Sequence, residues 1–189
     1  MFKRKTPGEG DELVNCVGSS ITTPIVKTKY CYLAKPFYYP GSSIGRYSLT
    51  CLFDETKKED AEFLKTIEDI ATANEVDMIG YLDGKLISIK FQTKDKIGLF
   101  CLAKGKKKPK EIKLDHDLKE GYLVTVTFDL NTYYNKKTGK NGFNFCPKKI
   151  IFHVDDEETI FNEASNDRIS KGSRDRSKFA GNGLRDPKL

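Results

Sequence analysis

The stretch YCYLAKPFYY, residues 30–39, places five aromatic rings within ten positions, with Lys35 and Pro36 between them. A strand that only fills a core has little use for so many tyrosines, because a buried phenol needs a hydrogen-bond partner. Rings that stay partly exposed beside a lysine can instead stack on unpaired bases while the cation pairs with phosphate. This chemistry favours a single-stranded nucleic acid as the ligand.

Further candidates occur on other segments. Arg46 and Lys90 lie opposite the apolar side of two alternating segments, and Tyr133 and Tyr134 precede a lysine-rich stretch in the segment that we predict as the loop between the last two strands. Duplex DNA is a poorer ligand, because the one predicted helix carries many carboxylates that would repel phosphate. We expect Tyr30, Tyr32 and Tyr133 to stack bases, Phe37, Tyr38 and Tyr134 to assist them, and Lys35, Arg46, Lys90 and Lys140 to pair with phosphates.

Strands must position most of these side chains, because the hydrophobic pattern is mainly of period two. The predicted strands are residues 28–35, 46–53, 85–93, 97–103, 122–130 and 143–154, the last interrupted at Pro147. Turn residues predict a hairpin between the first two strands and another, across residues 94–96, between the third and fourth.

One helix is predicted over residues 57–73. Its apolar residues fall on one stripe, Thr56 with Glu59 fits a capping box, and Asn74 can end it. With no alternation of strands and helices, the pattern indicates an all-β protein with one inserted helix. We predict an OB-fold-like antiparallel barrel of five to six strands, an architecture that binds oligonucleotides on one face.

Composition limits the other possibilities. The chain has 189 residues and a net charge of +6, which favours an anionic partner, and no apolar run reaches the ~18 residues of a membrane span. No secretory signal is evident, and the five cysteines are odd in number and widely spaced. An intracellular protein with reduced thiols is therefore expected. Without metal-ligand spacing and with only two histidines, we expect no metal, no cofactor and no enzyme activity.

The chain is expected to divide at residue 160. Residues 1–160 would form the barrel domain, and residues 161–189, which lack a core pattern, would form a flexible basic tail.

The segment YCYLAKPFYYPGSSIGRYSLTCLF resembles the opening hairpin of the single-stranded DNA-binding proteins of short-tailed, podovirus-type bacteriophages. The shared landmarks are an aromatic strand ending in Ala34, Lys35 and Pro36, a glycine at position 45, and Tyr47 with Leu49 in the next strand. The similarity continues in order through LISIKF and YLVTVTFDLNTYY to GFNFCPKKIIFHV, over roughly residues 25–154.

The resemblance implies an OB-fold protein that coats and protects single-stranded DNA during phage replication, recombination and repair, without catalysis, in the host cytoplasm. Members of that family recruit polymerase and helicase through an acidic tail. Here an acidic cluster at residues 155–158 precedes a basic end, so recruitment by the tail is not expected. A homodimer remains open.

Two other classes of function also fit the residues. An RNA-binding or translation-related OB module would use the same face, since RNA offers the same bases and phosphates. A virion or scaffolding protein would use the aromatic rings to bind protein.

Overall fold

The computed structural model describes residues 14–15, 20–38, 40, 42–76, 80–118, 120–135 and 139–156. Tyr39, the lysines at 136 and 137, and the predicted tail lie outside these residues. The elements are β1 (Val14–Asn15), β2 (Ile21–Thr22), β3 (Val26–Tyr38), β4 (Gly45–Phe53), α1 (Lys58–Ala73), β5 (Tyr81–Asp83), β6 (Leu86–Thr93), β7 (Gly98–Ala103), β8 (Lys110–Glu111), β9 (Leu123–Asn135) and β10 (Lys140–Val154).

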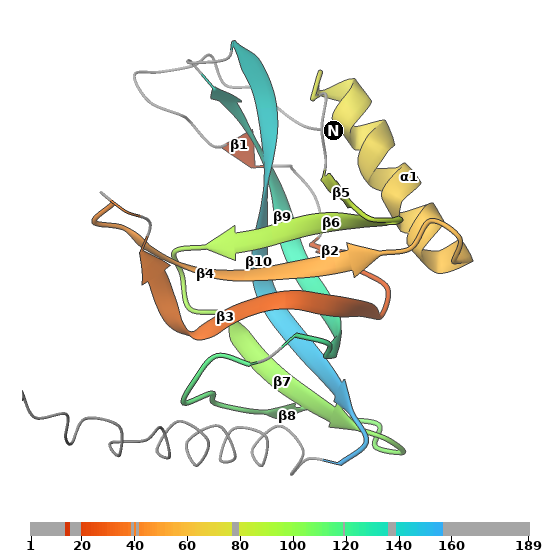
Figure 1. Ribbon diagram of the computed structural model, residues 1–189, viewed down its shortest axis with the longest axis vertical. Coiled ribbons are helices and arrows are strands. Elements are labelled where there is room, and N and C mark those ends of the chain that lie inside the picture. Colours follow the sequence, from red (N-terminus) through yellow and green to blue (C-terminus); the bar gives the residue numbers. More distant parts are fainter. Residues whose placement is uncertain are drawn as a thin grey trace, which may run out of the picture.

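Five long strands close into a barrel. β3 pairs with β4, β4 with β6, β6 with β10, β10 with β9, and β9 with β3, so the five strands form a ring. The closure is narrow between β9 and β3, at Val26 and Lys27. Figure 1 shows β3, β4 and β6 crossing the β9 and β10 pair as a second layer. The predicted barrel is confirmed, although β10 joins β6 in parallel, at Phe145 and Phe91, whereas the other four pairings are antiparallel.

The barrel interior is filled by alternate residues of these strands, as the period-two pattern predicts. Phenylalanines dominate it: Phe91 packs against Phe128 with ring centroids 5.1 Å apart and an interplanar angle of 70°. Each fully buried side chain of this kind contributes about 1.5–3 kcal/mol to folding. The largest fully buried side chains are Phe53, Phe91, Phe128, Phe152, Leu49, Ile67, Ile89, Leu130, Ile150, Val124 and Val126.

Helix α1 packs beside the barrel, where Phe63 stacks on Phe53 of β4 at 5.1 Å. The predicted capping box is wrong: the Thr56 hydroxyl donates to Asp54 Oδ1 at 2.6 Å, and no side chain caps the helix. The predicted end is confirmed, since Asn74 is the C-terminal cap and its Nδ2 donates to the Ile70 carbonyl.

Two predictions about strand pairing are wrong. β6 and β7 do not form a hairpin. Instead, β7 pairs in parallel with β10, from Gly98 opposite Lys149 to Ala103 opposite Val154. Nor does Pro147 interrupt β10: the register shifts between Pro147 and Lys149, and this irregularity accommodates a residue that has no N–H to donate.

Candidate nucleic-acid interface

The side of β3, β4 and β6 that faces away from the core carries the polar and aromatic side chains of interest. In the antiparallel register, Tyr30 lies opposite Thr50, and Thr50 lies opposite Lys90. Residues directly opposite one another point to the same face. Tyr30, Thr50 and Lys90 therefore form one row on what we call the outer face.

A second row lies two residues along each strand, with Tyr32 opposite Ser48 and Ser48 opposite Gln92. Farther along, Phe37 lies opposite Arg46. Strand β3 shifts register between Tyr32 and Phe37, so Lys35 projects, exposed, from an irregular stretch between these rows. The outer face thus brings together the residues that the alternation predicted for it.

The aromatic rings at the surface of β3 are accessible, although Tyr38, which follows Phe37 and lies opposite Gly45, projects from the other face of the hairpin. Tyr30 is 50% exposed, Tyr32 41%, Phe37 44% and Tyr38 56%, values far above those of the core phenylalanines. Tyr32 and Phe37 have ring centroids 5.7 Å apart and an interplanar angle of 35°. Partly supported rings with open faces are suited to stacking against bases.

A glycine lets one of these rings lie close to the sheet. A Cβ at Gly45 would come within 2.7 Å of Tyr38 Cζ. The Tyr38 ring therefore covers Gly45, its partner across the β3–β4 hairpin.

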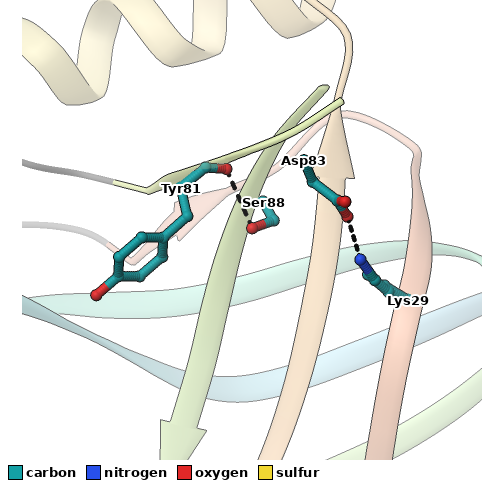
Figure 2. Close-up of polar contacts among 4 residues, drawn as sticks. All are labelled: Lys29, Tyr81, Asp83 and Ser88. Carbon is teal, nitrogen blue, oxygen red and sulfur yellow. Dashed lines mark hydrogen bonds and ion pairs between the residues drawn. The ribbon is translucent and has the colours of Figure 1, made fainter. Parts of the chain in front are cut away.

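An ion pair sets the charge beside Tyr30. Lys29 Nζ lies 5.6 Å from the centroid of the Tyr30 ring and pairs with the Asp83 carboxylate of β5. Figure 2 shows this contact, which ties the β5–β6 hairpin to β3 across β4. The hydrogen bond to Asp83 raises the pKa of Lys29, so the ammonium stays protonated at neutral pH. Part of its charge is neutralised by this partner.

Tyr81 belongs to the same surface, and the sequence reasoning missed it. It lies opposite Ser88, in the row next to Lys90, and its ring is 69% exposed. The Ser88 hydroxyl donates to the Tyr81 carbonyl at 3.1 Å, as Figure 2 shows. The sequence contained a signal for this hairpin in Asp83-Gly84, where Gly84 adopts a φ of 66°.

Tyr133, Tyr134 and Lys140 lie on the β9–β10 ladder. The prediction that the two tyrosines sit in a loop is wrong, because β9 runs to Asn135. Tyr133 lies opposite Gly142 and Tyr134 opposite Asn141, so the two rings project from opposite faces of the ladder. Both tyrosines are half-buried, and Lys140 is exposed at the start of β10. Among the described residues, none of the three is paired in register with β3, β4 or β6.

The described residues contain no group of three or more His, Cys, Asp or Glu side chains placed to hold a metal ion. Cys31, Cys51 and Cys101 are buried free thiols, and burial raises the pKa of Cys31 to about 12. Burial also raises the pKa of Cys51, so these two thiols are protonated at neutral pH and contribute to packing. No helix in the described part of the chain is long and apolar enough to cross a membrane.

The most informative comparisons are with solved structures. The single-stranded DNA-binding protein of bacteriophage Enc34, in a C-terminal truncation, matches with a TM-score of 0.58 and 15% identity, covering 80% of this chain and 94% of that chain. Its complex with single-stranded DNA matches with a TM-score of 0.57 and 14% identity, covering 80% and 95%. The gp2.5 protein of bacteriophage T7, also a single-stranded DNA-binding protein, matches with a TM-score of 0.52 and 16% identity, covering 72% and 92%.

At these identities the likeness establishes the fold. No protein-family model and no curated sequence matches this chain. The fold that the resemblance implied is therefore confirmed by structure: the chain has the fold of phage single-stranded DNA-binding proteins.

Proposed function

We propose that this protein binds single-stranded DNA without sequence preference, through the outer face of β3, β4 and β6. The observation that supports this most is the row structure: exposed tyrosines lie beside cations on the solvent side of a closed barrel. The structural neighbours are phage proteins described as single-stranded DNA-binding, one of them in complex with single-stranded DNA.

The aromatic rings bind the bases, and the cations bind the phosphates. Bases stack on Tyr30 and Tyr32, with Phe37 extending this face and Tyr38 lying beyond it at the end of β3, and each stacked base contributes about 1–3 kcal/mol. Lys90 lies in the row of Tyr30 and Arg46 lies opposite Phe37, and both pair with phosphates of the DNA backbone. No hydrogen bond to a base edge is needed for this, so binding tolerates any sequence.

The phosphate contacts make binding depend on salt. If about five phosphates are neutralised, each adds roughly −0.7 to the slope of log affinity against log salt, for a total near −3.5. A fourfold rise in salt then weakens binding about a hundredfold.

In its biological setting the protein would coat and protect single strands during phage DNA replication, recombination and repair, without catalysing a reaction. The basic residues at 161–189 would add affinity for the strand, since they are an additional source of cations. In this role the protein would have polymerase and helicase as its protein partners.

A titration tests the proposal. Labelled oligo-dT, a duplex of equal length and an equal-length RNA are added to the protein, and anisotropy is read together with tyrosine fluorescence. We expect oligo-dT to bind with quenching of the tyrosines and the duplex to bind far more weakly. Tighter binding of RNA would favour the RNA-binding alternative. Self-assembly without oligo-dT binding would favour a virion or scaffolding protein.

A further inference from the structure

A cleft of about 430 Å³ lies where the segment after β6 passes close to β10. Its walls come from three places: Arg46 on β4, the segment 93–96, and the facing strands β9 and β10. The volume falls in the range of about 300–1,000 Å³ that is typical of small-ligand sites. None of the stacking residues discussed above lines it.

The cleft adjoins the outer face through Arg46. This residue lies opposite Phe37 in the outer-face rows, and it also lines the cleft. Its charge acts on the thiol of Cys146 on β10, lowering a pKa that burial raises. A strand that follows the outer face past Phe37 therefore reaches the cleft.

Two amides in the cleft wall have weak or missing partners. Asn131 and Asn144 lie opposite each other on β9 and β10, 7% and 8% exposed. Each donates its Nδ2 to the same acceptor, Cys146 Sγ, at 3.0 Å. A thiol is a weak acceptor, and Asn131 Oδ1, which is buried, accepts no hydrogen bond from any described residue.

Buried polar groups are normally satisfied, so this arrangement calls for an explanation. Side-chain amides that lack strong hydrogen-bond partners in the free protein are available to a polar ligand. The Asn131 oxygen is covered, so the side chain must turn about its Cβ–Cγ bond to reach a ligand, and a single N–H···S contact opposes this turn only weakly.

The charges of the cleft favour an anion. Arg46, Lys94 and Lys96 line it, while the Asp129 carboxylate is paired with Lys148 at 2.6 Å. Asp95 is the other carboxylate in the lining. Cations therefore outnumber carboxylates around a space that also presents amides, which is the combination that one nucleotide requires.

We propose that the cleft takes one nucleotide of the bound strand, with its base against the amides of Asn131 and Asn144 and its phosphate against Arg46, Lys94 and Lys96. This inference rests on the proposed function and adds a defined site at one end of the outer face. Tyr133 shares the face of β9 that carries Asn131, so its ring flanks the same site. Binding as a whole stays tolerant of sequence, while one position of the strand is held by hydrogen bonds.

Alkylation of Cys146 reports occupancy of the cleft directly. N-ethylmaleimide labelling of the intact protein is followed by mass spectrometry of the peptide containing Cys146, with saturating oligo-dT, with a saturating abasic oligomer of equal length, and with inorganic phosphate. Saturation by each oligomer is verified by anisotropy. We expect oligo-dT to slow labelling at least about fivefold, because a base shields the thiol, and the other two to leave the rate nearly unchanged.

Each result decides the question. Unchanged labelling with oligo-dT bound would overturn the nucleotide site while leaving the proposed function intact. Equal protection by the abasic oligomer would also overturn it, because only backbone would then occupy the cleft. Absence of oligo-dT binding in the anisotropy measurement would instead contradict the proposed function.

A matched pair of variants provides a second measurement. Asn144→Leu should weaken oligo-dT binding about tenfold, the loss expected for a hydrogen-bonded contact. Asn141→Ala removes an asparagine from the same strand but the opposite face, where its Nδ2 donates to the Asn74 carbonyl. It should bind oligo-dT like the unmodified protein. Equal affinities for the two variants would count against the site, and if Asn144→Leu fails to fold, the alkylation experiment decides.

Discussion

Replacing Tyr30 and Tyr32 together by alanine separates binding from folding. Each ring stacks one base in the proposed complex, and stacking contributes about 1–3 kcal/mol per base. The double variant should therefore lose about 2–6 kcal/mol of binding free energy, which is at least a 30-fold rise in Kd.

The same change should cost less stability than the loss of two fully buried rings, and the double variant should still fold. Tyr30 is 50% exposed and Tyr32 41%, so each buries only about half of its surface. Full burial of a large apolar side chain contributes about 1.5–3 kcal/mol, so half of that for each of two rings is about 1.5–3 kcal/mol in total. For a chain of this size the melting temperature should fall by about 3–12 °C.

Phe91→Leu is the matched control, because Phe91 is an aromatic residue of the same sheet that is fully buried on the opposite face. It should lower the melting temperature by creating a cavity and leave the Kd for oligo-dT unchanged. The assays are anisotropy with labelled oligo-dT and thermal unfolding by circular dichroism. A folded double variant whose Kd stays within about threefold of the original would refute the stacking role, since even one lost stack exceeds that.

Four further outcomes follow from the structure. Lys90→Gln should reduce the steepness of the salt dependence by about 0.7, the contribution of one phosphate, measured by anisotropy over a salt series. Asp83→Asn should steepen the salt dependence by about as much, because Lys29 loses its carboxylate partner and becomes available to a DNA phosphate. An unchanged slope would show that Lys29 lies away from the bound DNA. Tyr81→Ala should weaken binding of a long oligomer more than of a short one if the strand continues over β5, and equal effects would exclude that path. Burial lowers the pKa of His153 in the folded protein, so the unfolded state binds more protons than the folded state once the pH is below the ordinary value near 6.5. The free energy of unfolding should therefore be unaffected by this group above that pH and should fall as the pH drops below it. His153→Gln should remove that part of the pH dependence in thermal melts between pH 7.5 and 5.

The long strands and the helix could be predicted because their patterns are strong and local. Alternation through β4 and β6 sets Arg46 and Lys90 opposite the core, and antiparallel pairing then brings them into rows with Tyr30 and Phe37. For these residues, local periodicity and sheet geometry lead to the same placement.

Other features depend on contacts that no short window of sequence contains. β7 pairs with β10, which is far away in the chain, so nearness to β6 misled the prediction. The cleft has the same origin, since Arg46, Lys94 and Asn144 come from separate segments. Thr56 looked like a cap, but its hydroxyl is held by Asp54, and such local competition cannot be resolved from residue types alone.

Photo-cross-linking tests the central claim most directly. Oligo-dT carrying 5-iodouracil at single positions is irradiated in complex with the protein, and the linked peptides are identified by mass spectrometry. The account predicts cross-links to Tyr30 and Tyr32 on β3, and it is contradicted if the cross-links fall on α1 or on β7 and β8 while β3 stays unlabelled.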